Sequence, residues 1–134
     1  MNNKTITKFL ILGLIIVTIS PAAMSHSNHG NDANVRAMAS MLASMQHFPS
    51  EEDKVKLQEI LDQDSSTDNE KTLASAIMRI EHQSDPEDAF SLDSIIESET
   101  ASGSVINIAI VIKNFSHGVS DADKRKLQLI NFKG

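Results

Sequence analysis

The feature that most constrains the fold of this chain is an internal repeat of 35 residues. Three stretches written in register at that spacing share five residue types without a gap. The shared residues are His47, His82 and His117; Asp53, Asp88 and Asp123; Leu57, Leu92 and Leu127; Ile60, Ile95 and Ile130; and Ala39, Ala74 and Ala109. This agreement predicts one structural unit repeated over residues 35–68, 69–103 and 104–134. Because 134 residues suffice for one domain, the three units are expected to share one core.

Each unit is predicted to contain two helices. Apolar residues spaced i, i+3, i+4 and i+7 fill the first half of a unit, and a second apolar stripe fills the other half. In the first unit the two stripes are Met38, Met41, Leu42 and Met45, then Leu57, Ile60 and Leu61. Segment 105–115 is rich in Val and Ile and alone resembles a strand, but its register with the other units favours a helix. The sequence therefore predicts an all-α fold of three antiparallel helix pairs, arranged as a short right-handed array or a compact six-helix bundle.

The turn between the two helices of a unit carries a helix-start signal. Ser50, Asp85 or Ser120 stands at the expected N-cap, and an aspartate follows three residues later in every unit. Polar segments 62–70 and 97–103 are predicted to link the units. The 35-residue period is similar to that of tetratricopeptide-like arrays, but their pattern of Trp, Leu-Gly, Tyr and Pro is absent.

The N-terminal segment is typical of a secretory signal peptide over residues 1–25. Lys4 and Lys8 precede an apolar run over residues 9–19, and small residues follow, so cleavage is expected before His26, with sites after Ala22 or Ala23 as alternatives. An uncleaved anchor is less favoured, because this run is shorter than the roughly 20 residues that span a bilayer. The mature protein is therefore predicted to be periplasmic or secreted, with residues 26–34 as a flexible lead-in.

Composition excludes several classes of protein. The chain has no cysteine, which rules out disulfides, thiolate metal sites and a lipid-modified cysteine. Its net charge is -6, and residues 26–134 carry 10 basic against 18 acidic side chains, since Lys4 and Lys8 account for two of the 12 basic residues. An acidic body with few aromatic residues is not expected to bind nucleic acid.

The five histidines are the candidate metal ligands, for Cu or Zn. His47, His82 and His117 recur at the turn of each unit, and we call them the elbow histidines. In stacked units, equivalent residues lie at least one helix spacing apart, about 8–10 Å, so the three could share an ion only if the units closed around an axis. We therefore expect them to cap helix carbonyls rather than to bind metal.

Two further metal-binding features occur near the N-terminus. His26 and His29 could chelate Cu(II) with a new amino terminus, although a solvated tail is the simpler interpretation. Met38, Met41 and Met45 resemble the methionine-rich runs of copper-handling proteins, but aligned positions in the other units hold ordinary core residues. These methionines are therefore predicted to be core.

No catalytic set is visible in the sequence. The aligned His and Asp lack a recurring Ser or Cys nucleophile, and there is no glycine-rich phosphate loop, so we predict no enzyme activity and no cofactor. The leading hypothesis is a module of the bacterial envelope that binds a protein or peptide between its helix pairs. The alternative is a periplasmic Cu- or Zn-binding or buffering protein that uses its histidines.

Overall fold

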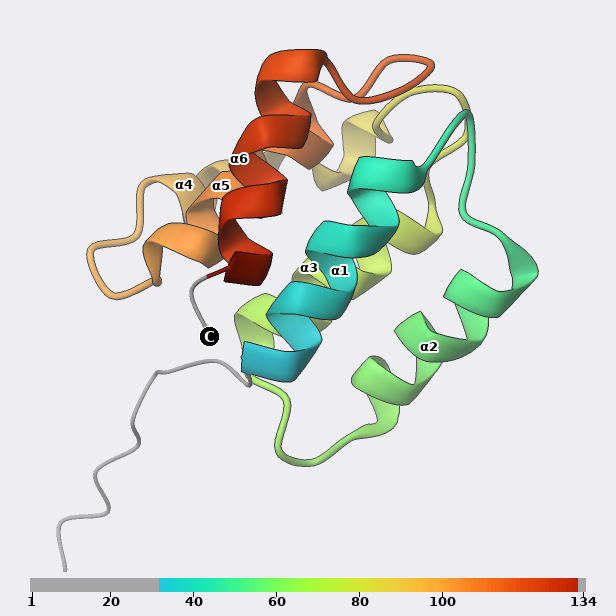
Figure 1. Ribbon diagram of the computed structural model, residues 1–134. Coiled ribbons are helices and arrows are strands. Elements are labelled where there is room, and N and C mark those ends of the chain that lie inside the picture. The colour runs from blue at the N-terminus through green and yellow to red at the C-terminus, as the bar shows by residue number, and fades with distance from the viewer. Residues whose placement is uncertain (1–31, 133–134) are drawn as a thin grey trace, which may run out of the picture.

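The computed structural model describes residues 32–132, and within this range every regular element is a helix (Figure 1). The elements in chain order are α1 (Asp32–Ser44), α2 (Glu51–Asp62), α3 (Asp68–Met78), the short 3-10 helix η1 (Pro86–Asp88), α4 (Ala89–Ile96), α5 (Gly103–Lys113) and α6 (Asp121–Phe132). The predicted all-α class is confirmed. The segment 105–115, whose composition also suits a strand, is helical through most of its length as α5.

The helices form an inner and an outer set. Helices α1, α3 and α5 each contact the other two and make up the centre of the molecule. Of the outer helices, α2 packs on α3, α4 packs on α5, and α6 returns to pack on α1 (Figure 1). The last helix therefore lies against the first, and the six helices form a closed bundle rather than an open array.

This arrangement corrects the expected pairing of the helices. The sequence predicted that the two helices of one unit would pack against each other, yet α2 packs more extensively on α3 than on α1. The connection of residues 63–67 turns α2 back onto the helix that follows it, as in an antiparallel helix hairpin. The elbow between α1 and α2 instead carries the chain from the inner set to the outer set.

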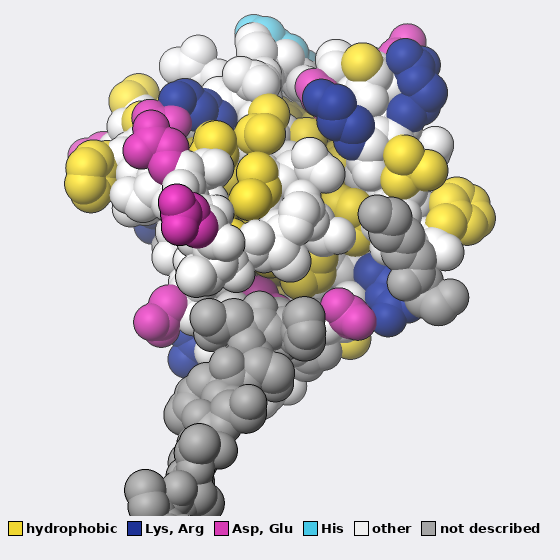
Figure 2. Space-filling view, turned by 90° about the vertical axis from the view of Figure 1, so that its left-hand side faces the viewer, with side chains coloured by type: hydrophobic (Ala, Val, Ile, Leu, Met, Phe, Trp, Pro, Cys, Tyr) yellow, Lys and Arg dark blue, Asp and Glu magenta, His cyan; other side chains and the backbone are white. Residues whose placement is uncertain are grey.

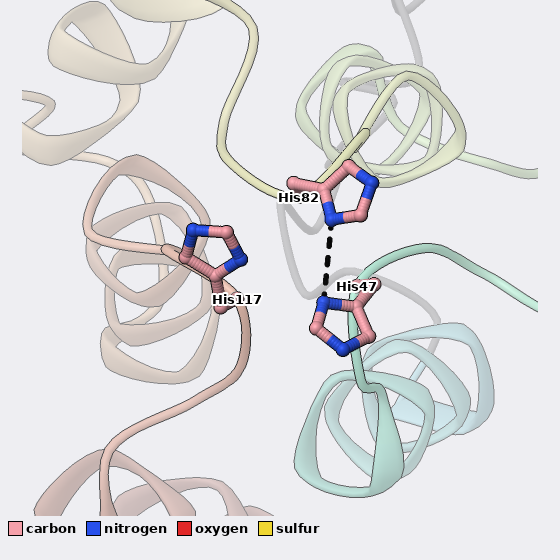
Figure 3. Close-up of side chains that lie close together, drawn as sticks. All are labelled: His47, His82 and His117. Atoms are coloured by element: carbon pink, nitrogen blue, oxygen red, sulfur yellow. Dashed lines mark hydrogen bonds between the residues drawn. The ribbon is translucent and has the colours of Figure 1, made fainter.

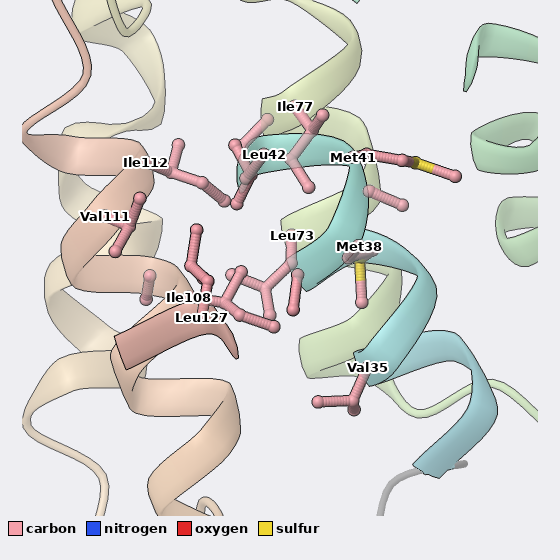
Figure 4. Close-up of a cluster of buried hydrophobic side chains, with 14 of the residues drawn as sticks. Val35, Met38, Met41, Leu42, Leu73, Ile77, Ile108, Val111, Ile112 and Leu127 are labelled. Atoms are coloured by element: carbon pink, nitrogen blue, oxygen red, sulfur yellow. The ribbon is translucent and has the colours of Figure 1, made fainter. Parts of the chain in front are cut away.

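The core lies between the inner helices and under the outer ones (Figure 4). The predicted inner stripe is buried in all three units, and so are Leu57, Leu92 and Leu127, which are 0% exposed. The three aligned alanines, Ala39, Ala74 and Ala109, are also 0% exposed. Met38, Met41 and Met45 are buried in the same cluster, which confirms the prediction that they are core residues.

Helix starts occur in segments predicted to be linkers. Thr67 caps α3, and the Glu70 side chain returns a bond to the Thr67 N–H, which completes a capping box. Ser102 caps α5, where its Oγ accepts a hydrogen bond from the Val105 N–H at 3.3 Å. Polar composition made these segments look like loops, although Thr67 and Glu70 stand in the S/T-x-x-E pattern that marks a helix start.

The N-terminal boundary also differs from the prediction. Helix α1 begins at Asp32, within the segment 26–34 that was expected to be a lead-in. The side chain of Asn34 helps to fix this first turn, since its amide donates to Ser66 Oγ at 3.1 Å. The predicted signal peptide lies outside the described residues. Within residues 32–132, no helix has the length and apolar character that crossing a membrane requires.

The second unit modifies the predicted helix start between its two helices. In the first unit Ser50 and Asp53 form a full capping box, whereas the second unit has an aspartate, Asp85, at the cap position. Two carboxylates would repel each other there, and Arg79 lies close to both. It donates to the buried carboxylate of Asp88 and lies 3.9 Å from Asp85 Oδ2, and these contacts raise the pKa of Arg79.

In the third unit, Asp123→Ala should lower the free energy of unfolding at neutral pH by about 0.5–1 kcal/mol. Asp123 accepts hydrogen bonds from Lys126 Nζ at 2.8 Å and Ser120 Oγ at 2.7 Å, and these bonds lower its pKa below 3.8. A carboxyl with a depressed folded-state pKa stabilises the protein above its unfolded pKa and loses that effect as the pH falls through the folded value. The difference in unfolding free energy between the parent and Asp123→Ala should therefore shrink below about pH 4.

Urea unfolding at pH 7 and in acid measures this difference. Asp121→Ala, an exposed acid in the same helical turn, is the matched control and should cost less. A cost for Asp123→Ala that stays constant into strong acid would contradict the assigned role.

Candidate metal-binding site

The three elbow histidines lie where the C-terminal ends of the inner helices meet. His47 follows α1, His82 follows α3 and His117 follows α5, each within four residues of the end of its helix. Because α1, α3 and α5 pack on one another, their three elbows come together at one end of the bundle (Figure 3). The site is therefore built from residues 35 positions apart in the chain.

The backbone at each elbow histidine adopts the left-handed region. The φ angles are 29° at His47, 65° at His82 and 57° at His117, and within residues 32–132 no other residue except glycine has a positive φ. This conformation costs roughly 1–2 kcal/mol for a residue that carries a Cβ. Glycine is the usual residue at such a position after a helix. Histidine is one of the residues that occupy this region more often than most others, and here it does so at all three equivalent positions.

Backbone hydrogen bonds join the three elbows to one another. The His82 N–H donates to the carbonyl of His47 at 2.6 Å, and the His117 N–H donates to the carbonyl of His82. An isolated antiparallel bridge pairs Gln46 with Gly118 and so connects the first elbow to the third. These contacts hold the three left-handed residues in a ring, which fixes where their side chains begin.

The three imidazole rings face one another across a small space (Figure 3). Their centroids are 5.1 Å apart for His47 and His82, 5.8 Å for His47 and His117, and 5.7 Å for His82 and His117. One ring nitrogen from each lies within 4.8 Å of the others, and the Nδ1 atoms of His47 and His82 are 3.3 Å apart. All three side chains are exposed, and histidine reaches the surface at the top of Figure 2.

This geometry overturns the expected separation of about 8–10 Å between equivalent histidines. That expectation assumed an open stack, and the closed bundle instead turns all three elbows inward. The expected carbonyl caps are also supplied differently. The backbone N–H groups of Met45, Ile80 and Phe115 donate to carbonyls in the last turn of each inner helix.

The inner helices also provide an electrostatic environment that favours a cation. A helix carries a partial negative charge of about half an elementary unit at its C-terminal end. Three such ends converge near the elbow histidines, which follow them by three or four residues. The only basic residue in the last turns of these helices is Lys113, which is paired with Asp93.

The nitrogen spacing suits a tetrahedral ion. Two imidazole nitrogens bound to tetrahedral Zn²⁺ at about 2.0–2.1 Å are separated by about 3.3–3.4 Å. The Nδ1 atoms of His47 and His82, which form a hydrogen bond with each other in this structure, are 3.3 Å apart and so have this separation already (Figure 3). The third ring needs only a modest closure, since its nitrogen lies within 4.8 Å of the others. Side-chain rotation of exposed rings can supply that closure.

The remaining candidate ligands are the tail histidines and the methionines Met38, Met41 and Met45. His26 and His29 lie outside the described residues, so their predicted role stays a prediction. Met38 and Met41 of α1 are buried in the core, and Met45, just past the end of this helix, is only 6% exposed. Sequence reasoning named the elbow histidines but not their convergence, which depends on contacts between helices far apart in the chain.

Comparison with protein-family models, with curated proteins and with solved structures finds no match for this chain.

Proposed function

We propose that the protein binds one divalent transition-metal ion through His47, His82 and His117. The observation that carries the proposal is the convergence of three exposed imidazoles whose ring nitrogens lie within 4.8 Å of one another. Neutral imidazole nitrogens are common ligands for Zn and Cu. The left-handed backbone at all three positions supports the same function, because strain that recurs at one site indicates a use for the side chains held there.

Zn²⁺ fits this cluster better than Cu²⁺. Cu²⁺ favours square-planar or tetragonal ligand sets, in which neighbouring nitrogens are about 2.8–2.9 Å apart. Three rings arranged around an axis make a pyramid instead, and their closest nitrogens are separated by 3.3 Å, the tetrahedral value. Cu²⁺ binds most nitrogen sites more tightly than Zn²⁺. At this site we expect the ratio of the Cu²⁺ affinity to the Zn²⁺ affinity to be smaller than usual.

We also infer that the six helices are three copies of one helix pair arranged around the axis on which the elbow histidines lie. Three sets of equivalent residues support this architecture: the left-handed histidines, the fully buried alanines and the fully buried leucines. The contact of α6 with α1 lets the third copy meet the first, as a closed arrangement requires.

Binding of a protein or peptide stays a prediction. Its reason was the extended surface of an open array, and the closed bundle no longer provides that reason. Export, the absence of enzyme activity and the tail site at His26 and His29 also stay predictions of the sequence. If the predicted signal peptide directs export, the elbow site would bind Zn²⁺ in the bacterial envelope.

Calorimetric titration of Zn²⁺ tests the proposed site. The chain carrying His26→Ala and His29→Ala should bind one ion, with a rise in melting temperature, and binding should weaken in acid as protons compete for the imidazoles. His82→Asn should lower the affinity at least about 100-fold, because loss of a ligand costs more than loss of an outer-shell partner. Asparagine tolerates the left-handed region, so the variant is expected to fold.

Gln83→Asn, an exposed change at the next residue, is the matched control and should leave the affinity unchanged. His82→Gly should also lose binding, and glycine should relieve the backbone strain at that position. A dissociation constant weaker than about 0.1 mM for the parent, or equal affinity of the parent and His82→Asn, would overturn the proposal.

A further inference from the structure

Among residues 32–132, the elbow site offers three protein ligands. Within residues 32–132, the group of potential ligand atoms around the cluster contains the three histidines and no carboxylate. All three rings are exposed, so the side of the cluster away from the core faces water. Tetrahedral Zn²⁺ takes four ligands, and a site with three protein ligands leaves one position for an outside group.

Backbone length limits how the tail histidines could reach that position in the same molecule. The elbow site lies beyond the C-terminal end of α1, and this helix of 13 residues is about 18 Å long. His29 precedes Asp32 by only three residues, a reach of about 11 Å even in a straight chain. His26 would need a fully extended path along the whole helix. In the chain with His26→Ala and His29→Ala, the fourth position is left to a ligand from solution.

Charge decides which kind of ligand this position favours. Three neutral imidazoles leave the ion with its full double positive charge, and the partial charges of the helix ends lie on the opposite, protein side. An anion on the solvent side would neutralise part of this charge without being buried. The closest acid in sequence is Glu81, whose exposed side chain lies outside the ligand group.

We infer that the metal-loaded site holds an open fourth position on its solvent side and binds a small monodentate anion there. This inference rests on the proposed function. It makes the protein a receptor for metal and anion together, in which His47, His82 and His117 hold the ion and the anion completes the tetrahedron.

Co²⁺ in place of Zn²⁺ gives a direct readout, because its visible absorption responds to the number and type of its ligands. The chain with His26→Ala and His29→Ala is loaded with Co²⁺ and titrated with azide, using perchlorate at equal ionic strength as the non-coordinating control. The expected result is a saturable spectral shift with azide and none with perchlorate. Glu81→Gln should leave both the starting spectrum and the azide shift unchanged.

The possible outcomes separate the two claims. If neither Co²⁺ nor Zn²⁺ binds, or if binding survives His82→Asn, the metal site itself is wrong. If Co²⁺ binds through the elbow histidines but azide leaves its spectrum unchanged, the metal site stands and the open position is wrong. A starting spectrum that changes in Glu81→Gln would show that Glu81 fills the fourth position, which also overturns the inference.

Discussion

Leu127→Ala should lower the free energy of unfolding by about 2–5 kcal/mol. Leu127 is 0% exposed on α6, the helix that closes the bundle against α1, and it lies among inner-helix residues such as Ile108 and Leu73 (Figure 4). Truncation removes buried methyl groups and leaves a cavity that closely packed neighbours cannot fill. Urea unfolding followed by circular dichroism measures the loss.

Leu129→Ala is the matched control for this prediction. It is the same substitution two residues away on the same helix, but Leu129 is 61% exposed, so its cost should stay within about 0.5 kcal/mol. Leu57→Ala and Leu92→Ala should cost nearly as much as Leu127→Ala, because all three positions are 0% exposed. Equal stability of the Leu127 and Leu129 variants would contradict the packing of α6, and widely different costs at the three buried leucines would contradict the three-copy architecture.

Ala74→Leu should destabilise the protein by about 1–3 kcal/mol. Ala74 is 0% exposed on α3, at one of the three aligned positions where the inner helices hold a small side chain. A larger side chain there must push packed helices apart or adopt a strained rotamer. Thermal unfolding of the variant against the parent measures the effect.

Ser75→Leu tests whether the direction of the side chain decides the cost. Ser75 is the next residue along α3 and is only partly buried, with its Oγ accepting a hydrogen bond from Arg79 at 2.7 Å. Its replacement should therefore cost less than Ala74→Leu. Equal melting temperatures for the two variants would remove the assignment of the small residues to the helix contacts.

Much of the fold could be predicted from local patterns in the sequence. The apolar stripe of helix α3, Leu73, Ala76 and Ile77, follows the helical period and is buried as expected. The cap at Ser50 depends only on residues three positions apart, and it is present with its capping box. Such features are set within one or two helical turns, where sequence spacing determines distance in space.

The metal-site geometry depended on features that spacing does not determine. The pairing of α2 with α3, and of α6 with α1, decides whether equivalent residues lie side by side or far apart. The meeting of His47 with His82 and His117 follows from that closure. One signal was present in the sequence: histidine recurs just past a helix, where glycine or asparagine is the usual choice.

The packing of α6 on α1 also sets the order in which the chain can finish folding. The Asn131 amide donates to Ser40 Oγ at 3.1 Å across 91 residues of sequence, so the first helix gains its most extensive contact only when the last helix has been made. Contacts this distant in sequence form late, because a long loop must close before they gain any stability. A growing chain therefore lacks a complete core until α6 has been synthesised.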